Sequence, residues 1–205
     1  KMAKISVVMP VFNSERYLEE AIDSIRKQTF DDWEMLVINE FGSNDRSSEI
    51  IKKYADIDHR IKLIQNTKKI GIAESLNLGI RLASGEYIAR IDADDLAETD
   101  RFQKQVDLLD SFPEVVICGG WQLHFGKNVW IHTTQSDPEQ CKANLLFYCD
   151  LCHSTLMIRK KTILEHKLFY DKKYFAEDFE LWTRFVQYGK ITNIPEVLGK
   201  YREGE

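Results

Sequence analysis

The sequence lacks the features that would mark several other classes of protein. It has no apolar run near the roughly 18 residues that a membrane-spanning helix needs, no internal repeat and no low-complexity tract. Its 28 Lys and Arg are outnumbered by 33 Asp and Glu, giving a formal net charge of -5. A general nucleic-acid binder needs a basic face to hold the phosphate backbone. We therefore expect no nucleic-acid partner.

The sequence also lacks a cleavable signal pattern, because its first apolar run passes straight into a polar helical segment. We expect a cytoplasmic protein whose four cysteines are thiols rather than disulfides. Cys149, Cys152 and His153 fit the C-x-x-C-H spacing of covalent haem attachment. No export signal and no second metal-type pair accompany this pattern. We interpret it as a coincidence rather than as a haem, zinc or redox site.

The remaining composition, 43% hydrophobic and 30% charged over 205 residues, is ordinary for a globular protein. In the first hundred residues, short apolar runs predict strands at 5–12, 35–38, 61–64 and 87–91, with a helical pattern after each of the first three. Asn13 or Ser14 is expected to cap the first helix. This alternation is typical of a βαβ arrangement with a mostly parallel sheet.

The second half is less regular. Strands are expected at 115–118, 121–131, 153–158 and 190–194, and helices at 99–112, 138–147, 160–166 and 178–188. We predict one α/β domain over 1–205, with a nucleotide-binding half at about 1–98 and a more variable, acceptor-binding half at about 99–205.

Two pairs of acidic residues are candidates for metal binding or catalysis. Asp92 and Asp94 directly follow a predicted strand, and alternation along a strand would point both carboxylates into one space. Ligands of open α/β sheets bind beyond the carboxyl ends of the strands, and carboxylates suit Mg²⁺ or Mn²⁺. Glu177 and Asp178 stand just before a predicted helix, where one of them is suited to act as a general base. A solvated acidic turn and an ordinary helix-terminal acid pair are the alternatives.

In order along the chain, six segments resemble family 2 glycosyltransferases of the GT-A fold. They are ISVVMPVFN, WEMLVINEFGSNDRS, NTKKIGIAESLNLGIRLASGEYIARIDADD, HSTLMIRK, FAEDFELWTRF and IPEVLGKYR. The resemblance covers about 5–202. It implies a three-layer α/β sandwich around a central, mostly parallel mixed sheet, and transfer of a sugar from a nucleotide diphosphate donor to a hydroxyl acceptor with inversion.

The resemblance also implies roles for individual residues. The nucleoside pocket would be lined by Pro10, Val11, Phe12 and Asn13, and Glu40 would read the base. Many members have two Asp before Gly-Ser where this chain has Glu40 and Phe41, so the base is left open. We expect UDP first, with GDP or dTDP as alternatives.

Within the Asp92-Ala93-Asp94 trio, the resemblance implies that Asp94 binds Mn²⁺ or Mg²⁺ and that Asp92 contacts the ribose or the donor sugar. Ala93, between them, is expected to belong to the donor nucleotide site. In the Glu177-Asp178 pair it implies that Asp178 is the base that deprotonates the acceptor. Lys68, Lys69 and Arg202 are weaker candidates for contacts with the diphosphate. His153 is expected to line the acceptor pocket or to pack inside the protein. Trp182 is expected to support the base, to form a platform for a sugar, or to pack in the core.

The acceptor is expected to be a glycan or a lipid-linked sugar in cell-envelope polysaccharide assembly, with peripheral membrane association, on the inner face of the plasma membrane. We also expect that a C-terminal extension carried by many members is missing. A sugar-phosphate nucleotidyltransferase is disfavoured because residues 10–13 contain no glycine, and a dehydrogenase because G-x-G-x-x-G is absent. A nucleotide-sugar-binding module without turnover is the alternative from another class.

Overall fold

The computed structural model describes residues 2–204, whose strands form a nine-stranded mixed sheet. In the first half of the chain, strands and helices alternate as the sequence predicts. The order is β1 (Ile5–Val11), α1 (Leu18–Arg26), β2 (Trp33–Asn39), α2 (Ser47–Ile57), β3 (Ile61–Gln65), α3 (Ile72–Leu82) and β4 (Tyr87–Arg90). Parallel pairing joins β3, β2, β1 and β4 in that spatial order, so the carboxyl ends of these strands lie at one edge.

The second half extends the same sheet. Its elements are β5 (Leu96–Ala97), α4 (Arg101–Ser111), β6 (Val115–Phe125), β7 (Trp130–His132), α5 (Pro138–Asn144), η1 (His153–Thr155), β8 (Met157–Arg159), α6 (Lys160–His166), α7 (Glu177–Phe185) and β9 (Lys190–Arg202). Strand β8 runs antiparallel between β4 and β6, and β6 pairs in parallel with β9. The antiparallel pairing of β5 with β9 brings the end of the chain back to the segment that follows β4.

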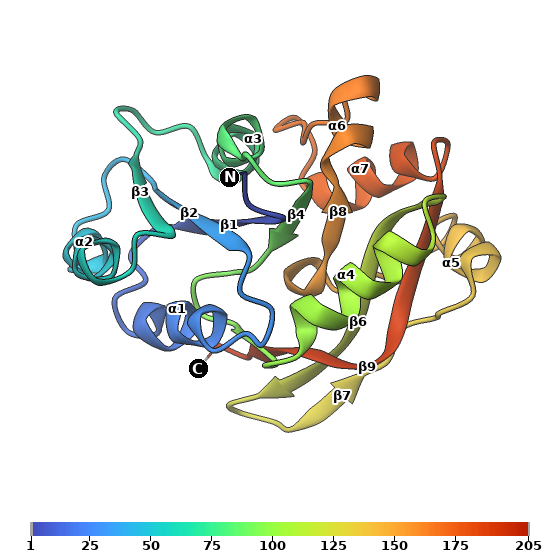
Figure 1. Ribbon diagram of the computed structural model, residues 1–205, viewed down its shortest axis with the longest axis horizontal. Coiled ribbons are helices and arrows are strands. Elements are labelled where there is room, and N and C mark those ends of the chain that lie inside the picture. Colours follow the sequence, from blue (N-terminus) through green and yellow to red (C-terminus); the bar gives the residue numbers. More distant parts are fainter. Residues whose placement is uncertain (1, 205) are drawn as a thin grey trace.

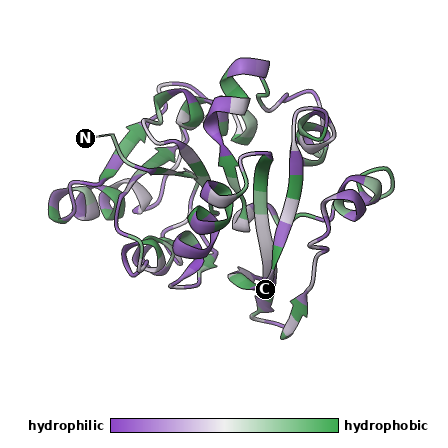
Figure 2. Cartoon of the chain, turned by 45° about the vertical axis from the view of Figure 1, so that its right-hand side comes forward, coloured by the Kyte–Doolittle hydropathy of each residue, from purple (hydrophilic) through white to green (hydrophobic). Residues whose placement is uncertain are grey.

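Helices cover both faces of the sheet, as the expected three-layer arrangement requires. One core cluster joins β1 and β2 to α1, α2 and α4, and the other joins the opposite face to α3, α6 and α7. Figure 1 shows α3, α6 and α7 in the upper part of the view and α1 in the lower left part. In Figure 2, hydrophobic colour is concentrated on the central strands and hydrophilic colour on the outer helices. The predicted α/β fold class is confirmed.

The central position of β1 explains its sequence. Every residue of this strand except Pro10 is buried, because β2 and β4 flank it and helices cover both of its faces. A parallel strand buried on both faces reads as a continuous apolar run rather than an alternating one.

The apolar segments of this chain are short. Within residues 2–204, no helix is both long enough and apolar enough to cross a membrane.

Three local predictions are wrong. Helix α1 begins only at Leu18, and the position before it is Tyr17, without a side-chain cap, instead of Asn13 or Ser14. The two strands expected at 115–118 and 121–131 are replaced by a single strand, β6, and by the short β7. The strand expected at 153–158 begins as the one-turn helix η1, and the strand itself covers only residues 157–159.

Candidate functional site

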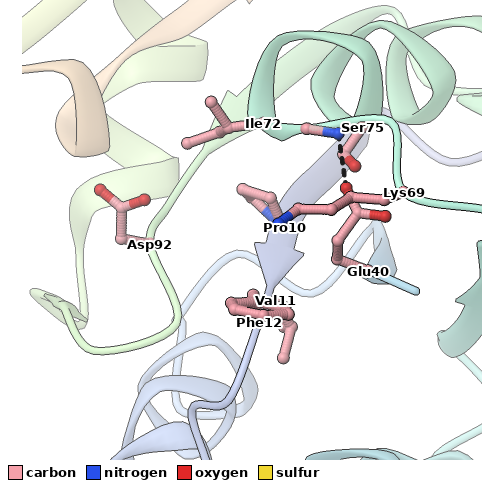
Figure 3. Close-up of a pocket in the computed structure, with 9 residues that line it drawn as sticks. Pro10, Val11, Phe12, Glu40, Lys69, Ile72, Ser75 and Asp92 are labelled. Carbon is pink, nitrogen blue, oxygen red and sulfur yellow. Dashed lines mark hydrogen bonds between the residues drawn. The ribbon is translucent and has the colours of Figure 1, made fainter. Parts of the chain in front are cut away.

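A pocket of about 310 Å³ opens where β1 and β2 end. Figure 3 shows the end of β1 between Glu40 on one side and Asp92 on the other. Six of the residues predicted to bind the donor nucleotide line this pocket, together with three that were not predicted. The nine lining residues are Pro10, Val11, Phe12, Glu40, Lys69, Gly71, Ile72, Ser75 and Asp92.

Glu40 lines the pocket, but its carboxylate is largely engaged by the protein. It accepts backbone N–H bonds from Gly71 (2.6 Å), Phe41 (2.8 Å) and Ile70 (3.2 Å), and a side-chain bond from Asn66 (3.3 Å). Burial alone would raise the pKa of Glu40, yet these hydrogen bonds outweigh burial and lower it. The ionised carboxylate therefore ties the loop before α3 to the end of β2 and so shapes one wall of the pocket.

Phe12 and Lys69 are exposed residues of the pocket lining, whereas Asn13 is engaged by the neighbouring turn. The Lys69 ammonium lies 5.8 Å from the Phe12 ring centre, at the outer range of a cation–π contact. Asn13 has a left-handed backbone with φ of 50°, and its Oδ1 accepts the backbone N–H of Asn44 at 2.9 Å. Asn13 thus fixes the turn after β2, and it is absent from the lining.

Gly71, Ile72 and Ser75 are the lining residues that the sequence analysis missed. Gly71 precedes the first residue of α3 and has φ of 82°, a conformation that glycine adopts at little cost. The first turn of α3 therefore forms one side of the pocket. A helix N-terminus presents unpaired N–H groups and favours anions. A glycine placed just before an amphipathic helix was the signal that would have identified this wall.

The segment after β4 departs from the strand geometry assumed for it. Because β4 ends at Arg90, Asp92 and Asp94 lie beyond the strand, at a turn, so the strand alternation from which their common direction was predicted does not apply to them. Asp92 faces the pocket and forms an ion pair with the buried Arg90. Ala93 is buried beneath the turn, outside the pocket lining.

Asp94 and Asp95 point in different directions. Asp94 is exposed, and partial desolvation, followed by the neighbouring Asp92 carboxylate, raises its pKa. Asp95 is 1% exposed and accepts the backbone N–H of Arg202 at 3.0 Å. The Arg202 side chain lies against the same turn, donating to the backbone carbonyl of Asp94 at 3.1 Å. The end of β9 thus braces the acidic turn.

These carboxylates suit a divalent ion that arrives together with a nucleotide. Within the described residues, no group of three or more His, Cys, Asp or Glu side chains is placed to hold a metal. Mg²⁺ commonly binds through one or two carboxylates plus substrate phosphates rather than in an all-protein cage. Asp94, exposed and beside a second carboxylate, is suited to that kind of partial site.

The second acidic pair lies on the first turn of α7. Glu177 and Asp178 are its first two residues, where the helix dipole favours negative charge. Asp178 Oδ1 accepts the backbone N–H of Phe179 at 2.7 Å, and its Oδ2 lies 3.7 Å from Nδ1 of His153. With 29% of its side chain exposed, Asp178 is open to solvent on one side and contacts a histidine on the other.

His153 and Trp182 lie behind Asp178. The His153 ring meets Trp182 edge-on, with 5.6 Å between ring centres, and its Nε2 is 2.8 Å from the hydroxyl of Tyr170. Trp182 is fully buried and belongs to the core cluster, which agrees with the expectation of core packing and leaves no exposed face for a sugar platform. Burial raises the thiol pKa of Cys149 to about 11 and of Cys152 to about 12, which fits inert thiols. All four cysteines are free, as expected.

The wider likeness of the chain agrees with this geometry. Residues 6–181 match the model of the family described as glycosyl transferase family 2. The chain belongs to this family. An uncharacterized glycosyltransferase from Haemophilus influenzae is 36% identical over 97% of this chain, and the chain spans 65% of that relative's length. The predicted enzyme class, glycosyltransferase, is confirmed at the level of the family.

Solved structures confirm the predicted GT-A fold. The family 2 chain has a TM-score of 0.83 with S. aureus TarS residues 1–349 in complex with UDP, at 17% identity, covering 98% of this chain and 61% of that one. It has a TM-score of 0.75 with the mannosyltransferase PcManGT from Pyrobaculum calidifontis in complex with GDP-Man and Mn²⁺. That match has 18% identity and covers 98% of this chain and 57% of the other.

Proposed function

We propose that this family 2 chain transfers a sugar from a nucleotide diphosphate donor to a hydroxyl group of a glycan or lipid-linked acceptor, with inversion at the anomeric carbon. The observation that best supports this proposal is the pocket at the ends of β1 and β2, which has Glu40 on one side and Asp92 on the other. Its apolar strand end and the first turn of α3 suit a nucleoside and a diphosphate respectively. UDP is the first candidate for the carrier, because a structural neighbour binds it.

A divalent ion would be held by Asp94 together with the donor. When bound, Mn²⁺ or Mg²⁺ acts as a Lewis acid that neutralises charge on the diphosphate. The structural neighbour PcManGT was solved with Mn²⁺ and GDP-Man, which supports this proposal. Lys69, in the pocket lining, and Arg202, against the Asp94 turn, are the cations proposed to contact the diphosphate.

Asp178 would be the base. It accepts the proton of the acceptor hydroxyl as that oxygen forms a bond to the anomeric carbon. The bond between the anomeric carbon and the diphosphate oxygen breaks, and its electron pair leaves with the nucleotide. A single displacement of this kind inverts the configuration. Glu177 adds a second negative charge beside the base.

The donor and the base are tested together by nucleotide release. UDP-GlcNAc and GDP-mannose, each with Mn²⁺, are incubated with the protein, and free nucleoside diphosphate is measured with and without a glycan acceptor. We expect Asp178→Asn to lower release at least a hundredfold while nucleotide affinity stays within a few-fold. Asp107→Asn, at an exposed position on α4, is the matched control and should behave as wild type.

The alternative functions correspond to distinct outcomes of this assay. A nucleotide-sugar-binding module would bind the donor and release no nucleotide even as wild type. Undiminished release by Asp178→Asn would refute the assignment of the base. The proposal extends to a role in polysaccharide assembly, to peripheral membrane association, and to a donor half at about 1–98 followed by an acceptor half at about 99–205.

A further inference from the structure

A row of three polar side chains runs inward from Asp178. His153, from η1, stands between Asp178 and Tyr170, with Nδ1 3.7 Å from Asp178 Oδ2 and Nε2 2.8 Å from the Tyr170 hydroxyl. The other Asp178 oxygen is already fixed by the N–H of Phe179. One oxygen of the carboxylate is therefore set by its own helix, and the second faces the imidazole.

Burial keeps the His153 ring neutral, and the hydrogen bond at Nε2 then determines which ring nitrogen carries the proton. Only 15% of the His153 side chain is exposed, and burial, followed by the nearby Arg90 guanidinium, lowers its pKa well below the usual value. The ring is therefore neutral and has a single N–H. Burial raises the pKa of Tyr170, so its hydroxyl keeps its proton. If that hydroxyl donates to Nε2, the ring proton resides on Nδ1 and faces Asp178. The opposite tautomer would turn a lone pair toward the carboxylate.

The surroundings hold the ring in this orientation. Trp182 is fully buried and meets the His153 ring at 73°, and Tyr170 also packs edge-on against Trp182, with 6.1 Å between ring centres. Tyr170 is itself anchored, because its backbone N–H and carbonyl both bond to the side chain of Asn77 on α3, at 2.9 and 2.8 Å. The row thus connects the start of α7 to a helix of the donor pocket.

We propose that His153 is a positioning residue for Asp178, donating its Nδ1–H to Oδ2 while Tyr170 fixes the tautomer. This rests on the proposed function, in which Asp178 is the base. The separation of 3.7 Å exceeds an ordinary hydrogen bond, but catalytic hydrogen bonds commonly shorten when substrate binds. His153 then acts through Asp178, in contrast to the expectation that it contacts the acceptor.

Two substitutions separate this role from simple packing. An Asn at this position places its amide near the site of Nδ1, whereas the longer Gln places it near Nε2. His153→Asn keeps a donor toward Asp178, and His153→Gln keeps only the contact with Tyr170. With UDP-GlcNAc or GDP-mannose, whichever gives the larger release, we expect His153→Gln to lose at least tenfold in kcat and His153→Asn less than threefold. KM for the donor should stay unchanged in both. Equal losses in the two variants at matched melting temperatures would refute the proposal.

A second measurement is independent of turnover. In nitrogen-15 NMR of histidine-labelled protein, assigned with His153→Asn, the His153 signals should report protonated Nδ1 and unprotonated Nε2. Protonated Nε2 would overturn the proposal. Failure of the proposed function is distinguishable, because it would appear as full nucleotide release by Asp178→Asn. Failure of the positioning role would instead appear as the other tautomer, or as equal losses in the two His153 variants, with Asp178→Asn inactive.

Discussion

At the scale of the residue, Glu40 illustrates how a lining residue can serve a site through its contacts with the protein. Its carboxylate receives three backbone N–H groups and the amide of Asn66. Its lone pairs are occupied by the loop before α3, which leaves limited capacity for a base. The physical contribution of Glu40 is then to hold the pocket wall in place.

This predicts a uniform effect of Glu40→Gln on nucleotides. The Gln amide NH₂ would confront the donors of Ile70 and Gly71, and the loop would loosen. We expect a loss of about 1–3 kcal/mol in the free energy of unfolding and a similar fold-loss of affinity for UDP and GDP, measured by calorimetry. A loss confined to one nucleotide would show instead that Glu40 reads the base. Glu49→Gln, at an exposed position on α2, is the control.

Residue roles were predictable where a local pattern carried them. Pro10, Val11 and Phe12 lie on the pocket because they end a central strand, and central parallel strands are recognisable from a continuous apolar run. The partners of Asp178 were not predictable. Tyr170 meets His153 through a loop whose position depends on Asn77, 93 residues earlier in the chain.

At the scale of the element, prediction succeeded for the strands that a local apolar pattern defines. It failed at β6 and β9, which pair along almost their whole length. The strand predicted at 190–194 ends directly before Pro195. In the structure Gly120 pairs with Ile194 and Trp121 with Val197, so Pro195 lies in a bulge and donates no ladder hydrogen bond. A bulge of this kind lets the strand continue, and only the partner strand could reveal it.

Strand β2 also carries a buried acid that links three elements. Glu34 accepts bonds from Ser6 on β1, from Lys62 on β3, and from the backbone and hydroxyl of Ser84 after α3. Burial alone would raise the pKa of Glu34, but these hydrogen bonds outweigh it and lower the pKa to about 2. A lowered carboxyl pKa stabilises the folded state above the unfolded pKa, and the stabilisation is lost as pH falls through the folded pKa.

We expect that Glu34→Gln makes the free energy of unfolding less dependent on pH in the acid range. The wild-type carboxylate contributes up to about 3 kcal/mol, fully present above pH of about 4.5 and lost toward pH 2. The variant should be less stable than wild type at pH 7. Its free energy of unfolding, measured by urea unfolding, should change less than that of wild type between pH of about 4.5 and about 2. Glu165→Gln, on the exposed face of α6, should reproduce the wild-type curve. A variant curve parallel to wild type would contradict the role assigned to Glu34.

At the scale of the whole molecule, the end of β9 closes on the start of the chain. Arg202 stacks on Tyr17, with 3.9 Å to the ring centre, and pairs with Glu20 at 2.7 Å, while its backbone bonds to Asp95. The acidic turn after β4 is therefore held from both ends of the sequence. This contact between the end of β9 and the first helix follows from the pairing of β9 with β5 and β6, and no local sequence pattern predicts it.

This arrangement predicts that metal and nucleotide bind cooperatively. Asp92 is already paired with Arg90, which leaves Asp94 as the carboxylate for an ion, a weak site by itself. A nucleoside diphosphate alone would meet the same acidic turn unscreened. By linkage, each ligand should raise the affinity of the other by the same factor. A ligand at 100 times its Kd adds about 2.7 kcal/mol, a shift of a few degrees in a domain of this size.

We therefore expect the melting-temperature shift with UDP and Mn²⁺ together to exceed the sum of the two separate shifts. The same comparison with GDP, CDP and dTDP would identify the base, because only the matching nucleotide should show the excess. Asp94→Asn should abolish the excess and leave the small shift with nucleotide alone, since the pocket walls are unchanged. Strictly additive shifts in wild type would mean that the ion and the diphosphate do not share a site, and Asp94 would then be an ordinary surface acid braced by Arg202.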